Sequence, residues 1–238
     1  MLNAYIYDGL RSPIGRHAGS LASVRPDDLA ATVIKNLLEK TGIPAADVED
    51  VIFGSTNQAG EDSRNVARFA ALLAGMPVTV PGQTVNRLCA SGLGAVIDSA
   101  RAITAGEGEL YIAGGVESMT RAPFVMGKAE SAYSRDAKIY DTTIGTRFPN
   151  RKFTDQFGAH SMPETGDNVA EEFGISREQA DTFAAASQAK YQAAKEAGFF
   201  EGEITPIEVS QGRKLPPKLV TEDEHPRASS TFEALSKL

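Results

Sequence analysis

Apolar and polar positions alternate along the first half of the chain in a way that predicts strands and helices in turn. Apolar runs at 4–8, 48–53, 83–87 and 110–116 predict β-strands, and Gly9 ends the first of them. The run at 110–116 has few polar positions, as expected of a strand that is covered on both faces. Strands that alternate with helices form β–α–β units, so this half of the chain predicts an α/β fold.

Helices are predicted in the intervals between these strands. The first begins at Pro26 and ends at Gly42, because proline favours the first helical turn and glycine favours the end of a helix. Two others are expected over 63–74 and 90–105. The first helix is expected to have an apolar face formed by Leu29, Val33 and Leu37.

The pattern changes after about residue 118, where polar and glycine-dotted sequence replaces the regular alternation. We therefore expect two regions, 1–118 and 119–238. The second region contains one long helix, because Ser176 and Gln179 form a capping box and Gly198 supplies a stop. The expected apolar face of this helix is made by Ala180, Phe183, Ala184, Ser187 and Tyr191.

Charge and composition narrow the class of protein. A net charge of -7 argues against a general nucleic-acid binder, because phosphate binding needs a concentrated basic face. No run of about 20 apolar residues could span a membrane, and the N-terminus lacks the pattern of a signal peptide. The single cysteine excludes an intrachain disulfide, and no spacing suits a set of zinc ligands. These observations favour a cytoplasmic protein without a bound metal or a membrane segment.

That single cysteine, Cys89, falls at the predicted junction of a strand and a helix. A lone cysteine can be a small buried hydrophobic residue. At this junction, however, unpaired N–H groups and the helix dipole stabilise a thiolate, which makes a nucleophilic role plausible on physical grounds. The nearby Gly92 and Gly94 allow close backbone approach by a substrate or by a neighbouring strand. They match only part of a dinucleotide-binding fingerprint, because Ile97 replaces its third glycine.

A cysteine nucleophile needs a base, and the chain has the histidines His17, His160 and His225. His17 lies in a turn-like segment and His225 in a charged tail, so both are expected at the surface. His160, in F-G-A-H-S-M-P-E-T, is the one expected in a pocket.

Several motifs resemble those of the thiolase family. The segment N-R-L-C-A-S-G at 86–92 is similar to the nucleophile motif of that family. Y-I-A-G-G-V-E-S-M at 111–119 resembles its glycine-rich strand end, and R-S-P-I-G-R at 11–16 its N-terminal signature. Three further segments are similar to the branch of the family that acts on 3-oxoadipyl-CoA: G-E-D-S-R-N-V-A-R at 60–68, D-T-T-I-G-T-R-F at 141–148 and S-M-P-E-T-G-D-N-V-A at 161–170.

The resemblance implies a fold for each region. Residues 1–118 would form a thiolase-like α/β N-terminal half, with a mixed sheet covered by helices. Residues 119–238 would form most of an inserted loop domain that binds coenzyme A. The family's C-terminal half supplies N-E-A-F, G-H-P and C-x-G-G-G motifs, and none of them occurs in this sequence.

The resemblance also implies a reaction, in which Cys89 attacks a 3-oxoacyl-CoA and coenzyme A then takes the acyl group from it. Coenzyme A would be a substrate, and no other cofactor is expected. Its contacts would be Arg227, which suits the phosphate-bearing end, with Met162 and His160 near the pantetheine. Because the histidine and second cysteine of the missing motifs transfer protons in the family, this chain alone is expected to turn over little.

Other functions remain open at this point. One alternative is an acetoacetyl-CoA thiolase, whose substrate lacks the distal carboxylate of 3-oxoadipyl-CoA. In this chain, the possible partners of that carboxylate are Arg147, Arg151 and Lys152. The chain could also be a non-catalytic fragment that binds coenzyme A or oligomerises, or a nucleotide-binding domain. Acyl-CoA and coenzyme A are the expected small-molecule partners, and the resemblance implies a homo-dimer or homo-tetramer. Neither nucleic acid nor a membrane is expected as a partner.

Overall fold

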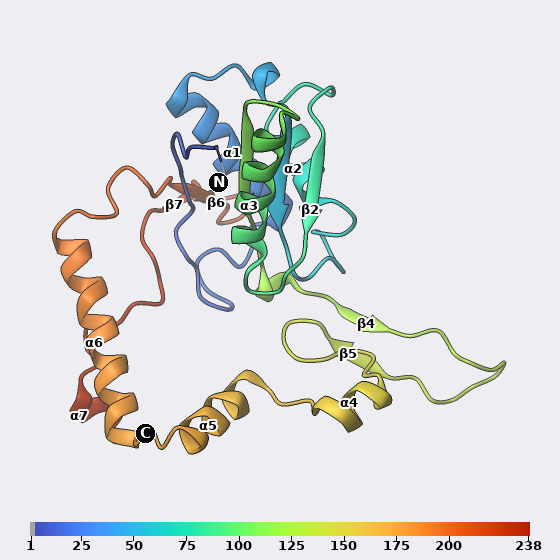
Figure 1. The fold of residues 1–238 in the computed structure, drawn as a ribbon, viewed down its shortest axis with the longest axis vertical. Coiled ribbons are helices and arrows are strands. Elements are labelled where there is room, and N and C mark those ends of the chain that lie inside the picture. Colours follow the sequence, from blue (N-terminus) through green and yellow to red (C-terminus); the bar gives the residue numbers. More distant parts are fainter. Residues whose placement is uncertain (1–2) are drawn as a thin grey trace. The chain divides into compact units, whose positions relative to one another are not determined.

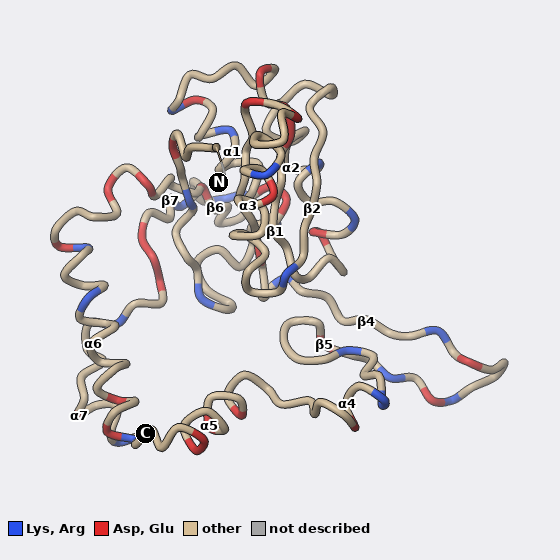
Figure 2. The backbone as a smooth tube through the Cα atoms, viewed as in Figure 1, with Lys and Arg blue, Asp and Glu red and all other residues tan. Residues whose placement is uncertain are grey.

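The computed structural model describes residues 3–238, which form two compact units. The first unit comprises residues 3–144 and Gly202–Glu222, and the second comprises Gly145–Glu201 and Asp223–Leu238. The expected boundary after residue 118 therefore falls inside the first unit, and the chain returns to this unit after an excursion. Basic and acidic residues are interspersed along the chain in both units (Figure 2).

The first unit is built on a parallel sheet of order β2-β1-β3. Its strands are β1 (Asp50–Gly54), β2 (Gly82–Val85) and β3 (Tyr111–Gly115). Three of the four predicted strands are thus present, and the α/β class is confirmed. β3 lies at the edge of this sheet, and Ile112 is its one buried residue, so the expected burial of both faces is not observed.

Helices cover both faces of this sheet (Figure 1). After β1 the chain forms α2 (Val66–Leu73) and enters β2, and α3 (Ser91–Ala105) then crosses back over β1 to β3. Because parallel crossovers are right-handed, these opposite directions of travel place α2 and α3 on opposite faces. The main core lies on the face of α2, where α1 (Pro26–Thr41) packs against it. This core includes Ile34, Val51, Phe53, Ala67, Ala70 and Ala71.

The ends of α1 follow directly from its sequence. Pro26 occupies the first turn, and Gly42 ends the helix in the left-handed conformation with its N–H donating to the carbonyl of Leu38. The buried side is turned relative to the expected one, since Ala30, Ala31 and Ile34 are buried. Leu29 instead packs against a second apolar cluster, which contains Ile207 and Val209.

The predicted strand at 4–8 is wrong, because these residues form no strand in the structure. Tyr5, Ile6 and Tyr7 are 91%, 85% and 78% exposed. A strand exists only when its backbone groups pair with a neighbour, and the described residues of this chain provide no ladder for 4–8. Its contacts with the unit are made by other groups, since the Asn3 N–H donates to the Thr104 hydroxyl at 2.9 Å and Lys40 pairs with Asp8 at 2.8 Å. The first backbone pairing follows at Arg11, whose N–H donates to the carbonyl of Glu203 at 2.8 Å.

Two antiparallel hairpins complete the first unit. β4 (Phe124–Met126) pairs with β5 (Ile139–Asp141), and β6 (Ile207–Val209) pairs with β7 (Lys218–Val220). The β6–β7 hairpin buries Ile207, Val209 and Val220 against Leu21, Val24 and Leu29, and so closes the side of the unit next to the N-terminus of α1. The first unit also contains the short 3-10 helices η1 (Ala45–Asp47) and η2 (Met119–Arg121).

The second unit is helical, with α4 (Arg151–Phe157), α5 (Met162–Glu172), α6 (Arg177–Glu196) and α7 (Phe232–Leu235). The predicted capping box of α6 is confirmed, because Ser176 and Gln179 each bond the other's backbone. Its predicted apolar face is only partly buried, since Phe183 is 78% exposed whereas Asp181 is 7% exposed. Arg177 pairs with Asp181 at 2.8 Å, which makes the burial of this carboxylate possible. Across residues 3–238, no helix has the length and apolar character needed to cross a membrane.

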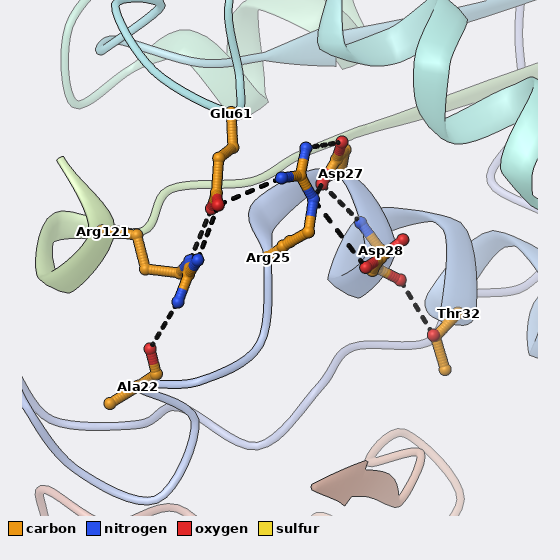
Figure 3. A network of polar contacts seen from close by, with 7 residues as sticks. All are labelled: Ala22, Arg25, Asp27, Asp28, Thr32, Glu61 and Arg121. Carbon is orange, nitrogen blue, oxygen red and sulfur yellow. Dashed lines mark hydrogen bonds and ion pairs between the residues drawn. The ribbon is translucent and has the colours of Figure 1, made fainter. Parts of the chain in front are cut away.

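A charged network holds three loops of the first unit together (Figure 3). Glu61 accepts hydrogen bonds from Arg121, one of them at 2.6 Å, and from Arg25 at 3.1 Å. Arg25 also pairs with Asp27 in the first turn of α1 at 2.7 Å. The hydrogen bond with Arg121 and the positive charges of Arg121 and Arg25 lower the pKa of Glu61 from its ordinary value of 4.5.

This lowered pKa predicts a pH-dependent effect of Glu61→Gln. The Glu61 carboxylate stabilises the folded state above pH 4.5, and this contribution is lost as the pH falls through the lower pKa of the folded state. We expect Glu61→Gln to reduce the free energy of unfolding by about 1 kcal/mol at pH 7. Urea unfolding at a series of pH values should show this difference shrinking below pH 4.5. An equal difference throughout the series would contradict the assignment.

Candidate active site

Cys89 lies between the end of β2 and the start of α3, as the sequence predicts, and its side chain is exposed. This is the edge where the carboxyl ends of the parallel strands meet, which is the usual place for sites in α/β proteins. The first N–H groups of a helix have no partner within the helix, so negative charge is favoured near this point. Exposure excludes the alternative of a small buried residue for Cys89.

The turn that presents Cys89 is strained and fixed by hydrogen bonds. Leu88 has a positive φ of 51°, which is uncommon for a residue other than glycine. Its N–H donates to the Asn86 side-chain oxygen at 2.9 Å. The Ser91 hydroxyl accepts from the N–H of Arg87 at 2.9 Å and donates to the carbonyl of Leu88 at 2.6 Å. A strained turn persists only where its surroundings determine it, and these bonds meet that condition.

Close packing of α3 against β1 places the N-terminus of the helix. A Cβ atom on Gly54 would lie 2.3 Å from the carbonyl carbon of Ser91 and 2.4 Å from the nitrogen of Gly92. Glycine is therefore required at the end of β1 for the helix to approach this closely. At Gly92 itself a Cβ would have only an ordinary contact, 3.9 Å from the oxygen of Gly114.

Polar groups tie the loops at this edge of the sheet to one another. Glu117, which follows β3, accepts hydrogen bonds from the N–H and hydroxyl of Thr56 and from the N–H of Asn57. The Thr56 carbonyl in turn accepts from the side chain of Asn86 at 3.1 Å. Asn57 is 7% exposed and donates to the carbonyl and hydroxyl oxygens of Thr142, each at 3.1 Å.

The sequence alone does not predict that these polar residues lie together. Glu117 lies in the segment 111–119 that resembles the thiolase strand end, and Thr56 and Asn57 follow a predicted strand. Their contacts depend on the order of the strands in the sheet. A usable signal existed, because polar residues that follow parallel strands gather at one edge of the sheet.

The three residues expected to contact coenzyme A all lie in the second unit, whereas Cys89 lies in the first. His160 is exposed, and Met162 is 72% exposed at the start of α5. Arg227 has an exposed side chain, and its N–H donates to Gln188 of α6 at 2.7 Å. Their contacts with coenzyme A stay predictions.

Charged and polar side chains lie close together at the start of α5. Ser161 and Glu164 form a capping box there. The backbone N–H of Ser161 lowers the pKa of Glu164, with further lowering by the Ser161 hydroxyl and by the electrostatic interaction with His160. His160 thus stands beside a carboxylate at a helix N-terminus.

The other residues singled out in the sequence are also at or near the surface. His17 and His225 are exposed, as expected. Arg151 and Lys152 are exposed in the first turn of α4, where Arg151 lies 3.6 Å from Asp155. Arg147 is partly buried in the segment before that helix. These cations share the second unit with His160 and Arg227.

The fold and the exposed thiol at a strand–helix junction define an α/β protein with a candidate cysteine nucleophile. A family model described as "Thiolase, N-terminal domain" matches residues 4–238. The chain is 56% identical to the beta-ketoadipyl-CoA thiolase of Acinetobacter baylyi and 44% identical to an acetyl-CoA acetyltransferase of Pseudomonas aeruginosa. Each match covers 100% of this chain and 59% of the relative.

A solved structure is similar as well. The crystal structure of the Bacillus anthracis acetyl-CoA acetyltransferase matches with a TM-score of 0.85 and 34% sequence identity, over 96% of this chain and 56% of that chain. The chain spans about 59% of the length of the curated relatives it matches. It belongs to the thiolase family.

Proposed function

We propose that Cys89 is the nucleophile of an acyl-CoA acyltransferase that cleaves 3-oxoadipyl-CoA with coenzyme A. The observation that carries the proposal is the position of Cys89, which is exposed on a strained turn directly before α3. The N-terminus of a helix attracts negative charge, and both a thiolate and the oxyanion formed on attack carry it. Membership of the thiolase family supplies the reaction class.

The proposed reaction divides one cleavage into two transfers. The Cys89 sulfur attacks the 3-oxo carbonyl carbon, and the bond between the second and third carbons breaks. The acyl group stays on sulfur as a thioester, and the departing carbanion takes a proton to become acetyl-CoA. The coenzyme A thiolate then attacks the thioester, which releases an acyl-CoA shortened by two carbons and regenerates the Cys89 thiolate.

Support for 3-oxoadipyl-CoA comes from the higher identity to a beta-ketoadipyl-CoA thiolase, 56%, than to an acetyl-CoA acetyltransferase, 44%. We propose that Arg147, Arg151 and Lys152 interact with the distal carboxylate of this substrate, since cations suit it. A full-length relative with all of these changed to alanine should lose its preference for 3-oxoadipyl-CoA over acetoacetyl-CoA. An unchanged preference would favour the alternative of acetoacetyl-CoA thiolysis.

Coenzyme A is a substrate in this proposal, and residues 119–238 supply its contacts. Arg227 would bind its phosphate-bearing end, and His160 and Met162 would lie along the pantetheine. We also propose a homo-oligomer, a dimer or a tetramer, and a cytoplasmic setting, where a catalytic thiol stays reduced.

The proposal is tested by the intact mass of the purified chain after incubation with 3-oxoadipyl-CoA or acetyl-CoA. We expect an acyl adduct that is absent in Cys89→Ala. Because the side chain is exposed, the substitution leaves the core unchanged and the variant should unfold as the wild type does. An adduct that persists in Cys89→Ala would contradict the assignment of the nucleophile. Absence of any adduct together with intact coenzyme A binding would favour a binding role without catalysis.

Steady-state turnover by this chain should be far below that of full-length relatives. The G-H-P and C-x-G-G-G motifs do not occur in its sequence, and general acid–base groups each contribute on the order of 100-fold to 10,000-fold. Thiolysis by purified 1–238 at the rate of a full-length relative would contradict this expectation.

A further inference from the structure

We infer that Glu117 is a positioning residue for Cys89, acting through Thr56 and Asn86 on the turn that presents the thiol. The inference rests on the proposed function in taking Cys89 as the nucleophile. It concerns a carboxylate that follows β3, the strand on the far side of β1 from the strand that leads to Cys89.

Glu117 is hydrogen-bonded to the loop that follows β1. One carboxylate oxygen accepts from the N–H of Thr56 at 2.8 Å and also from the Thr56 hydroxyl, and the other accepts from the N–H of Asn57 at 3.1 Å. Hydrogen bonds to an ionised acceptor are about twice as strong as neutral ones. Adjacent peptide groups held in this way fix the direction of the Thr56 carbonyl between them.

Hydrogen bonds of Asn86 connect the Thr56 carbonyl to the turn that carries the thiol. The side-chain nitrogen of Asn86 donates to the Thr56 carbonyl at 3.1 Å, which orients the amide so that its oxygen accepts the N–H of Leu88 at 2.9 Å. Leu88 holds the positive φ of the turn and directly precedes Cys89. The amide of Asn86 therefore joins the loop after β1 to the strained residue.

The loop after β1 is also joined to the end of β2 by the Ser55 N–H, which donates to the Val85 carbonyl at 3.1 Å, but this bond does not reach Leu88. The Ser91 hydroxyl fixes the other side of the turn, through Arg87 and the carbonyl of Leu88, and leaves the N–H of Leu88 to Asn86. Asn57 anchors the same loop to Thr142, but by its side chain, so its backbone N–H, which shares a peptide group with the Thr56 carbonyl, is left to Glu117. Glu117 therefore controls the orientation of the Thr56 carbonyl.

Glu117 can be changed without opening the core, because its side chain is exposed. Glu61→Ala is a matched control, since Glu61 is also a carboxylate that accepts hydrogen bonds in a neighbouring loop, and its partners are Arg121 and Arg25. Figure 3 shows that this second network joins Glu61 to Arg121 and, through Arg25, to Asp27 in the first turn of α1. A purely structural role predicts similar effects of the two substitutions, whereas a positioning role predicts an effect of Glu117→Ala alone.

The experiment compares wild type, Glu117→Ala, Glu117→Gln and Glu61→Ala as full 238-residue chains. The first measurement is amide hydrogen exchange in the peptide that contains Asn86 to Ser91. We expect about tenfold faster exchange in Glu117→Ala, a smaller increase in Glu117→Gln, which keeps one acceptor oxygen, and no change in Glu61→Ala. Equal exchange in Glu117→Ala and wild type would overturn the inference.

The second measurement is the rate of Cys89 acylation by 3-oxoadipyl-CoA, beside its alkylation by iodoacetamide. Misplacing a reacting group by about 1 Å costs on the order of 100-fold, so acylation should fall by up to this factor in Glu117→Ala, with alkylation nearly unchanged. Wild-type acylation rates in Glu117→Ala would overturn the positioning role. If the wild type formed no acyl adduct, the proposed function would fail, and the exchange data would still decide whether Glu117 holds the turn.

Discussion

Gly54→Ala should reduce the free energy of unfolding by about 3 kcal/mol, at the upper end of the usual cost of overpacking. The added methyl group would lie 2.3 Å from the Ser91 carbonyl carbon and 2.4 Å from the Gly92 nitrogen. Both are backbone atoms, so no side chain can rotate away, and α3 must move off β1. Urea unfolding measures the loss of stability.

The control for this prediction is Gly9→Ala, because a Cβ at Gly9 would have no atom within 4 Å. We expect its effect to stay within about 0.5 kcal/mol, as for most surface changes. Displacement of α3 should also slow acylation of Cys89, since the turn is continuous with the helix. If Gly54→Ala were as stable as Gly9→Ala, the close approach of α3 to β1 would be refuted.

Ser91→Ala should cost about 2 kcal/mol of stability. Ser91 is 4% exposed, and its hydroxyl both accepts from the N–H of Arg87 and donates to the carbonyl of Leu88. Alanine removes both bonds: the N–H of Arg87 loses this acceptor, whereas the carbonyl of Leu88 keeps the Ser91 backbone N–H at 2.9 Å. Thermal and urea unfolding of the variant measure this cost.

Ser236→Ala is the matched control, because the Ser236 hydroxyl also donates to a backbone carbonyl, that of Glu233 at 3.2 Å, but is exposed. Water can replace the lost bond there, so we expect a change of less than about 0.5 kcal/mol. Similar losses in both variants would show that burial of Ser91 does not govern its contribution.

Helix ends could be predicted from the sequence because they depend on residues within a few positions of one another. Pro26 and Gly42 bound α1, and the capping box of Ser176 and Gln179 begins α6. Such signals act through local backbone geometry and are little affected by the remainder of the fold.

The strand predicted at 4–8 and the apolar face of α6 show what local patterns cannot decide. Residues 4–8 are an apolar run of strand length, yet the presence of a pairing partner determines whether a strand forms. On α6 the buried side includes Asp181, held by Arg177, while Phe183 is exposed. The ion pair, one helical turn apart, compensates the buried carboxylate of Asp181, and this compensation cannot be read from the hydrophobic pattern.

In the candidate site, too, one feature could be predicted from a local segment and others could not. Cys89 was predicted from its own segment, because a strand–helix junction is visible in one stretch of sequence. Glu117 and Thr56 could not be paired from the sequence, since their contact requires β1 and β3 to be neighbours in the sheet. That neighbour relation is a property of the assembled sheet, and so is the need for glycine at Gly54.

The return of Gly202–Glu222 to the first unit sets an order of events during synthesis. Leu21, Val24 and Leu29 emerge early from the ribosome, but Ile207, Val209 and Val220, which cover them, emerge after the whole of α6. Until then this apolar surface is open to other chains and to chaperones. The nascent first unit therefore stays incomplete while residues Gly145–Glu201 of the second unit are made, and the last part of its core is made with β7.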